Sequence, residues 1–356
     1  MTKKSTHKDF PTAACCIYLS DRAGAFWQRY VESAESGGAA VITDPDLKRY
    51  VFQVWSFSDF AAEACISHPQ MFHELVASGD LQYRYRGNEY VHALTQRIAE
   101  ISEEDELMQR LRAVRRREML RIAFRDLAGW AELNETMRDV SSLADACIQT
   151  SLYLLAGWMR QEYGYPCNRF GKQQSMLVLG MGKLGASELN FSSDIDLIFA
   201  YPEPGKTRGG ILKIENEEYF EQLAQRLIYV LNTATHDGYV FRVDMRLRPF
   251  GESGALVQNF DALEHYYQAH GREWERYAFI KARIITGSAD ERAALMDIIR
   301  PFVYRRYIDY SAIDSMRKMK TMIDREVKRR GMHNNVKLGR GGYRGTCPMF
   351  RRCRKV

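Results

Sequence analysis

The chain has 356 residues, of which 46% are hydrophobic and 27% are charged. This is the composition of a globular protein, and the length allows two or three compact units. No apolar run reaches the roughly 20 residues that a membrane-spanning helix needs. The apolar stretch at 13–19 is too short for a signal peptide. We therefore expect a cytoplasmic protein without membrane contact.

The net charge gives no indication of nucleic-acid binding, and the cysteine spacing excludes a zinc site and a disulfide framework. The net charge of +6 is mild for this length and predicts attraction to phosphate groups in general, so it gives no reason to expect nucleic acid as a partner. The seven cysteines form no C-x-x-C pair, and their spacing suits neither a zinc site nor a disulfide framework. We expect reduced and mostly buried thiols.

Residues 1–165 are predicted to form a mainly helical N-terminal region. Ser58 is a candidate N-cap, His68-Pro69 interrupts the pattern after it, and apolar residues recur at helical spacing over 93–128 and 140–159. The polar face of the first of these two helices carries Arg112, Arg115, Arg116 and Arg117. We interpret these arginines as a solvated face paired with nearby acids, in preference to a nucleic-acid surface.

Residues 166–260 change in character and are predicted to form a separate domain around a small mixed sheet. Apolar strands are expected at 176–179, 194–201 and 239–247, and they are separated by a glycine-rich turn, a flexible loop at 202–210 and an amphipathic helix at 217–233. Residues 261–342 are again helical in pattern, and residues 343–356 lack any helical period, which predicts a disordered tail. The fold class is therefore α+β, with helical regions flanking the sheet domain.

The glycine-rich turn reads G-M-G-K-L-G over residues 180–185, which matches a dinucleotide-binding fingerprint. That fold needs a complete crossover helix before the next strand, and that strand should end in an acidic residue. Here the next strand begins only nine residues after Gly185, and its acids stand at its start. We therefore reject the dinucleotide interpretation and predict a tight turn whose backbone N–H groups can approach a phosphate.

Two carboxylates occupy the start of the second strand. Because side chains alternate along a strand, Asp194 and Asp196 should share one face, while Ile195, Leu197 and Phe199 point into a core. Two adjacent carboxylates repel each other unless a cation lies between them, and Mg²⁺ prefers oxygen ligands. We predict a magnesium site here; an edge strand with two solvated acids is the alternative.

The third strand repeats this pattern, with Asp244, Arg246 and Arg248 expected on one face. An acid that holds metal beside arginines that neutralise phosphate oxygens would suit phosphoryl chemistry. A salt-bridge ladder between the aspartate and the arginines is the alternative. With Asp194, Asp196 and Asp244 as metal ligands, the set predicts two-metal phosphoryl transfer.

Longer motifs carry a family resemblance. The small residues 184–186, followed by Asp194-x-Asp196, resemble the polymerase-β-type nucleotidyltransferase superfamily, although Ala186 stands where Gly or Ser is usual. The stretches 179–185, 188–190, 192–198, 244–254, 272–276 and 281–283 are similar to the signature of the glutamine synthetase adenylyltransferase/adenylyl-removing enzyme. The resemblance runs from about residue 50 to Gly342.

That resemblance implies a function in the regulation of nitrogen metabolism. Members of this family carry two nucleotidyltransferase domains, and the position of the domain in this chain matches the N-terminal one. That domain removes AMP from a tyrosine of glutamine synthetase by phosphorolysis and releases ADP, while the second domain attaches AMP from ATP. The resemblance also implies a response to the PII signal protein. The implied nucleotide and phosphate contacts are Gly182, Lys183, Gly185, Ser193, Arg246, Arg248 and Lys337.

The sequence departs from the family after Gly342. The family continues with an apolar residue, an arginine, an acidic residue and a long helix, whereas Tyr343-Arg344 is followed here by a stretch without the acid. We hypothesise a frameshift near Arg344 that ends the chain early, and a downstream DNA sequence without any remnant of a second domain would contradict it. Two alternatives are a stand-alone nucleotidyltransferase with a small acceptor, and an inactive fragment that only binds glutamine synthetase or nucleotide.

Overall fold

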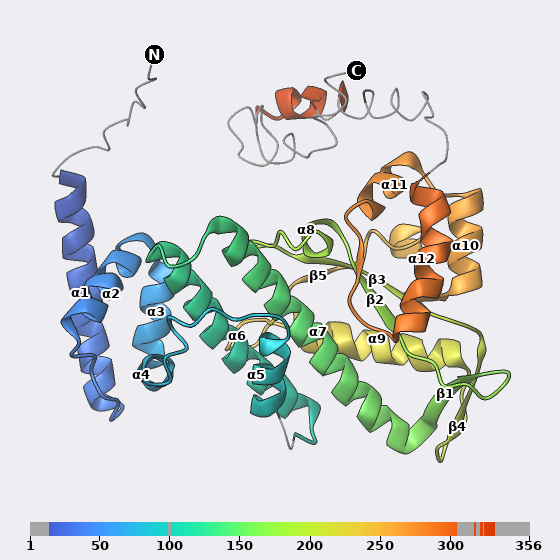
Figure 1. Cartoon of the computed structure of the whole chain (residues 1–356), viewed down its shortest axis with the longest axis horizontal. Coiled ribbons are helices and arrows are strands. Elements are labelled where there is room, and N and C mark those ends of the chain that lie inside the picture. The colour runs from blue at the N-terminus through green and yellow to red at the C-terminus, as the bar shows by residue number, and fades with distance from the viewer. Residues whose placement is uncertain (1–13, 99–100, 305–316, 318–320, 323, 332–356) are drawn as a thin grey trace.

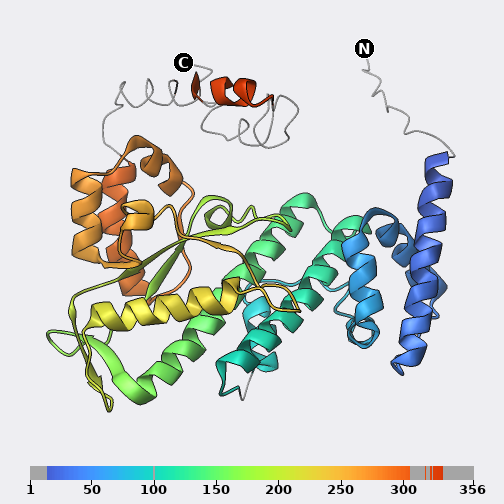
Figure 2. The same ribbon diagram turned by 180° about the vertical axis from the view of Figure 1, so that it is seen from behind.

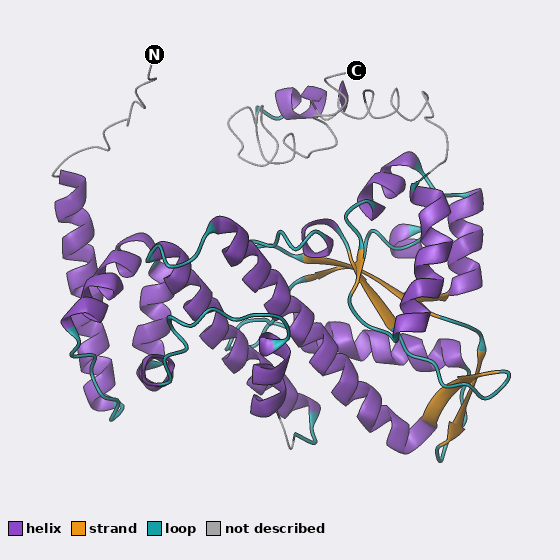
Figure 3. Ribbon diagram, viewed as in Figure 1, coloured by secondary structure: helices purple, strands orange, loops and turns teal. Residues whose placement is uncertain are grey.

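In the computed structural model, a group of N-terminal helices leads into a small sheet domain that further helices cover (Figure 1, Figure 3). The structure describes residues 14–98, 101–304, 317, 321–322 and 324–331. Lys337 and the predicted tail at 343–356 therefore lie outside the described residues. No described helix has the length and apolar character needed to cross a membrane.

The described elements follow one another without internal repetition. The helices are α1 (Ala14–Ser36), α2 (Pro45–Phe57), α3 (Asp59–Ser67), α4 (Pro69–Ala77), α5 (Glu89–Arg97), α6 (Glu104–Leu127), α7 (Leu133–Tyr163), α8 (Gly182–Gly185), α9 (Asn216–Asn232), α10 (Phe260–Ala269), α11 (Glu273–Phe279) and α12 (Ala289–Val303). The strands are β1 (Gly164–Asn168), β2 (Leu177–Gly180), β3 (Ile195–Tyr201), β4 (Gly205–Gly209), β5 (Val243–Asp244), β6 (Val257–Asn259) and β7 (Arg283–Ile284).

Side-chain capping and proline geometry set where two of the first helices begin. The Ser58 side chain accepts a hydrogen bond from the Ala61 amide at 3.2 Å, which starts α3. Proline fits the first helical position, so α4 begins at Pro69 and the chain breaks at His68. Both features were predicted. The helix predicted over 93–128 is instead two helices, α5 and α6, and α7 is longer than predicted because it ends only at Gly164, whose φ is +75°.

Of the four predicted arginines, Arg112 and Arg117 are buried and Arg115 and Arg116 are half-buried, so the predicted solvated face is wrong, whereas the predicted pairing with a nearby acid holds for Arg117 and Glu118. Arg112 and Arg117 are 2% and 5% exposed, and Arg121 is fully buried. Arg121 donates to Glu118 and to the Tyr83 carbonyl, both at 2.8 Å, and its guanidinium lies 3.8 Å from the Tyr85 ring centroid. These partners come largely from the loop before α5, which helical periodicity does not reveal. The cluster is an internal ion-pair network and offers no surface for nucleic acid.

This network gives a stability prediction. Glu118 is 1% exposed and pairs with both Arg117 and Arg121. Glu118→Ala leaves two buried guanidinium groups without their shared carboxylate, and we expect a loss of about 3–5 kcal/mol in the free energy of unfolding. Urea unfolding followed by circular dichroism measures it. Glu106→Ala serves as control, since the Glu106–Arg110 pair is solvent-exposed; equal losses in both variants would contradict the expectation.

A neighbouring acid predicts a pH dependence. Burial raises the pKa of Asp139 from 3.8 to about 6, against the opposing charge of Arg121. The folded chain therefore binds a proton that the unfolded chain has released, so the contribution of Asp139 to stability falls as the pH rises between these two values and is constant above them. We expect Asp139→Asn to gain stability relative to the natural chain over that window. Parallel urea titrations at pH 4 to 8 test this, and a pH-independent difference would contradict it.

The main sheet has the strand order β5-β3-β2-β7, with β6 also paired to β3. β2 and β3 are antiparallel, whereas β5 and β6 both run parallel to β3. The sheet separates two cores. Ile195, Leu197 and Phe199 pack towards α7 and α9, as predicted, and Ile198 and Ala200 pack towards α10 and α12 (Figure 1). The α+β class is confirmed.

Two predictions about the strands need correction. The strand predicted over 239–247 is only two residues long, because the chain turns directly after Asp244. The loop predicted over 202–210 contains β4, which pairs with the unpredicted strand β1 to form a separate two-stranded arm beyond the ends of α7 and α9 (Figure 2). Gly205 lets the two strands approach closely, since a Cβ there would lie 2.0 Å from the Cys167 carbonyl oxygen.

The cysteine prediction holds for the three described thiols, Cys65, Cys147 and Cys167, which are buried and free.

Candidate active site

Two of the three predicted carboxylates lie side by side. β3 and β5 are parallel neighbours, and their register places Asp196 opposite Asp244. Registered residues of adjacent strands share a face and lie about 5 Å apart between their α-carbons. The backbone N–H of Ile195 donates to the Arg242 carbonyl at 2.9 Å and fixes that register. The sheet therefore brings together acids that are 48 positions apart in the sequence.

Asp194 takes a different position. It precedes β3 by one residue, and its Oδ1 accepts a hydrogen bond from Arg242 Nε at 2.5 Å, with both side chains 51% exposed. Among the residues that the structure describes, no three His, Cys, Asp or Glu side chains gather as a metal-binding group. Arg242 was not predicted as a site residue, although the same alternation that relates Asp244 to Arg246 also relates Asp244 to Arg242.

The glycine turn lies against the Asp196 carboxylate. Gly182 has a φ of +55°, and a Cβ added to it would lie 2.9 Å from Asp196 Oδ2. The Met181 amide donates to the Asp196 carbonyl oxygen at 2.9 Å, so backbone contacts hold the turn to β3. Only glycine meets both demands, a left-handed backbone and close approach to a side chain. The turn thus forms one wall around Asp196.

The other predicted contacts in this region serve the turn and the loop after it. A Cβ on Gly185 would lie 1.8 Å from the Lys281 carbonyl oxygen, so Gly185 allows close packing of the backbone. Lys183 Nζ donates to Asn190 Oδ1 and to Ser193 Oγ, both at 3.2 Å. The structure therefore brings Lys183 and Ser193 together, directly before Asp194.

Asp244 ends its strand by capping the next turn. Its Oδ1 accepts the Arg246 backbone N–H at 2.9 Å, and Arg246 Nε lies 3.0 and 2.9 Å from the two carboxylate oxygens. These hydrogen bonds from Arg246 lower the pKa of Asp244 below its ordinary value, so the carboxylate stays ionised at neutral pH. Arg246 thus forms the alternative Asp–Arg salt bridge and leaves most of its own side chain, 73%, exposed to solvent.

Arg248 does not continue the face of Asp244. Its Nη1, Nη2 and Nε donate to the carbonyl oxygens of Met245 at 3.0 Å, Glu252 at 3.2 Å and Gly254 at 3.3 Å. The guanidinium therefore closes the loop 245–254 from inside. Its role as a phosphate contact stays a prediction, and a phosphate would have to compete with these carbonyl oxygens.

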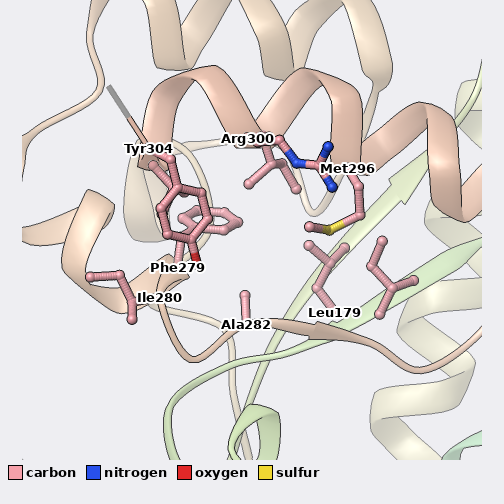
Figure 4. Close-up of a pocket in the computed structure, with 10 residues that line it drawn as sticks. Leu179, Phe279, Ile280, Ala282, Met296, Arg300 and Tyr304 are labelled. Atoms are coloured by element: carbon pink, nitrogen blue, oxygen red, sulfur yellow. The ribbon is translucent and has the colours of Figure 1, made fainter. Parts of the chain in front are cut away.

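The carboxylate pair lies in neither of two cavities found among the described residues. A small cavity between β2 and α12 is lined largely by apolar side chains, among them Leu179, Ala282 and Met296, with Arg300 at its edge (Figure 4). A wider cleft lies between α7, β1 and α9 and includes Tyr153, Arg160 and Arg292. Neither lining contains an Asp or Glu side chain. The candidate site therefore lies apart from both, at the start of β3 and β5, where the Asp244 side chain is 17% exposed.

The chain resembles proteins of known family. Residues 49–297 match the family described as glutamate-ammonia ligase adenylyltransferase. Three relatives carry the name bifunctional glutamine synthetase adenylyltransferase/adenylyl-removing enzyme. The relative from Nitrosococcus oceani is 52% identical over 89% of this chain and 33% of its own length. The relative from Pseudomonas putida is 51% identical over 82% of this chain and 30% of its own length.

The third relative, from Pseudomonas aeruginosa, is 48% identical over 93% of this chain and 34% of its own length. The chain therefore spans about a third of the length of the curated relatives that it matches.

Proposed function

The chain belongs to the glutamate-ammonia ligase adenylyltransferase family, and we propose that it is a nucleotidyltransferase that acts on glutamine synthetase. In this proposal it removes AMP from a modified tyrosine by magnesium-dependent phosphorolysis. The observation that carries the proposal is the register of β3 against β5, which sets Asp196 beside Asp244 at the wall formed by Gly182. The names of the relatives support glutamine synthetase as the protein substrate.

The arrangement of elements supports a polymerase-β-type domain. A glycine-containing turn joins two antiparallel strands, β2 and β3, and the second of them begins with the acidic residues. A parallel neighbour, β5, supplies the third acid after the intervening helix α9. We assign this fold to residues 166–260, with mainly helical regions before and after it among the described residues; the second of these regions adds β7 to the main sheet.

The donor set fits a magnesium ion in part. Asp196 and Asp244 offer carboxylate oxygens on one face, which is the ligand type that Mg²⁺ prefers. Asp194 would join them only by leaving Arg242. Bound there, the ion would neutralise charge that develops on the phosphate oxygens.

The proposed reaction exchanges a phosphoester bond for a phosphoanhydride bond. An oxygen of inorganic phosphate attacks the α-phosphorus of the tyrosyl-AMP ester, the bond from that phosphorus to the tyrosine oxygen breaks, and the tyrosine oxygen takes up a proton. The products are ADP and the free tyrosine. Arg246, held beside Asp244 and largely exposed, is placed to neutralise the phosphate oxygens as they approach. Lys183 and Ser193 supply further polar groups before Asp194.

A binding role without turnover is the second candidate. The observation that favours it is the Asp194–Arg242 ion pair, which keeps one predicted ligand away from the other two. In that case the chain would bind glutamine synthetase or a nucleotide such as ATP or ADP and release no product. Measurements of nucleotide binding would give the same result for both candidates, and turnover separates them.

The deciding experiment incubates the purified chain with AMP-modified glutamine synthetase, Mg²⁺ and inorganic phosphate and follows ADP. The control carries Asp194→Asn and Asp196→Asn together. ADP that appears only with the natural chain, and only when phosphate is present, supports the adenylyl-removing function. A folded chain that binds the modified substrate but yields no ADP contradicts this function and supports the binding role.

A further inference from the structure

The helix α7 is joined to the back of the glycine turn through a partly buried ion pair. Asp145, on α7, offers Oδ2 to Arg283 Nη1 at 2.7 Å and Oδ1 to Arg283 Nη2 at 3.0 Å. Such a two-point contact fixes the plane of the guanidinium as well as its position. The Asp145 side chain is 18% exposed and that of Arg283 34% exposed, so solvent screens the pair only in part.

The same guanidinium reaches the glycine turn. Arg283 Nη2 donates to the Leu184 carbonyl oxygen at 3.0 Å, and Leu184 lies within the short helix α8. Arg283 itself belongs to β7, where it pairs with Gly180 at the end of β2. Arg283 of β7 thereby holds the C-terminal end of the turn. The other end of the turn is held to β3 by the Met181 amide.

The turn passes this constraint to Asp196. Gly182 lies two residues before Leu184, and its α-carbon is so close to the Asp196 carboxylate that a Cβ there would lie 2.9 Å from Oδ2. A second hydrogen bond joins the same part of α7 to the segment after the turn. The Leu189 amide donates to the buried Ser141 hydroxyl of α7 at 3.1 Å. A displacement of the turn would change the space around the Asp196 carboxylate directly.

We propose that Asp145 and Arg283 are positioning residues, which hold the glycine turn against Asp196 and so set the geometry of the phosphate-exchange site. This rests on the function proposed above, because it assigns the turn to that site. Both side chains act through the Leu184 carbonyl, to which Arg283 donates and beside which Asp145 holds the guanidinium. The pair also makes the site depend on α7, the long helix that links the N-terminal helices to the sheet (Figure 1).

The chain offers a matched control arginine. Arg276 is 6% exposed, and it also combines one carboxylate, Glu273 at 2.8 Å, with one backbone carbonyl, that of Phe302 at 2.9 Å. It belongs to α11, and both of these partners lie in α11 and α12, outside the glycine turn. Replacement of either arginine by lysine keeps the charge but removes the planar guanidinium, which donates to two acceptors at once. A general loss of stability should therefore appear in both variants.

The experiment compares Arg283→Lys with Arg276→Lys in the full chain. Hydrogen exchange, read by mass spectrometry, follows the amides of Gly185, Ala186 and Glu188, which are hydrogen-bonded within the turn region. In Arg283→Lys we expect exchange there to be about tenfold faster, as the loss of one hydrogen bond allows. We also expect kcat for ADP release to fall about tenfold without a change in KM for the modified glutamine synthetase. Arg276→Lys should show neither effect.

Unchanged exchange in Arg283→Lys, or equal changes in both variants, would overturn the positioning role. Asp145→Asn is the second test, since asparagine has the same shape but one acceptor in place of two; it should reproduce the faster exchange at the turn. The exchange measurement does not require turnover. If the natural chain releases no ADP, the proposed function fails, and the comparison of exchange rates still decides the positioning role.

Discussion

Asp244→Asn should lower the rate of ADP release by at least about a thousandfold, because a metal-binding carboxylate contributes several kcal/mol to the stabilisation of charge in phosphoryl transfer. Asparagine keeps the shape of the side chain and can still accept the Arg246 amide, so the turn after β5 should persist. The negative charge beside Asp196 is lost. Steady-state ADP release from AMP-modified glutamine synthetase measures the effect.

Asp237→Asn is the matched control for that variant. Asp237 also pairs with an arginine, Arg116, and its side chain is 21% exposed where that of Asp244 is 17% exposed. It lies in the turn between α9 and β5, away from the registered carboxylates. We expect this control to keep most of the activity. An Asp244→Asn variant that retains a tenth or more of the natural rate would contradict the assignment of Asp244 to the reaction centre.

The hydrogen bonds around Asp244 also limit which groups can make the activity depend on pH. Because Arg246 holds the pKa of Asp244 below its ordinary value, the metal-binding form is present throughout the neutral range and is lost only in strong acid. A fall in activity between pH 7 and pH 5 would therefore have to come from another group, such as the attacking phosphate. The Asp244→Asn variant, tested over the same range, separates the two sources.

Gly182→Ala should be the second severe change, with a fall in kcat of about a hundredfold, the effect expected when reacting groups are misplaced by about 1 Å. The new Cβ would lie 2.9 Å from Asp196 Oδ2, so the turn or the carboxylate has to move. The positive φ of +55° adds a backbone penalty of about 1–2 kcal/mol. Activity and thermal unfolding should both be measured.

The variant Gly79→Ala separates the cost of the positive φ from the cost of the contact with Asp196. Gly79 has a φ of +76°, and a Cβ there would meet nothing within 4 Å. It should lose a similar amount of stability through the backbone while its activity at permissive temperature stays near that of the natural chain. If Gly182→Ala and Gly79→Ala lose the same activity, the wall around Asp196 has no part in the chemistry.

Strand and helix starts could be predicted because their causes are local. Alternation places Ile195, Leu197 and Phe199 in a core, and Asp196 on the other side of β3. Ser58 and Pro69 start helices by capping and by fixed φ, which depend on the neighbouring few residues. The motifs also identified the family, which the match over residues 49–297 confirms.

The same local rule failed where long-range or side-chain contacts compete with it. Alternation over 239–247 predicted one long strand, but Asp244 accepts the Arg246 amide and turns the chain. Apolar periodicity placed four α6 arginines on a solvated face, yet one of them, Arg112, is buried and donates to the Gly238 carbonyl from another part of the chain. A periodic pattern shows which residues share a side but carries no information on what covers that side.

The sequence by itself indicated which acids and glycines belong to the candidate site, because strand alternation and turn chemistry act within a few residues. Only the tertiary structure decided that Asp196 lies beside Asp244 and that Asp194 turns to Arg242. It alone also placed Asp145 and Arg283 behind the glycine turn, from positions 138 residues apart. These contacts depend on the register of parallel strands and on the packing of α7, which form only when distant segments meet.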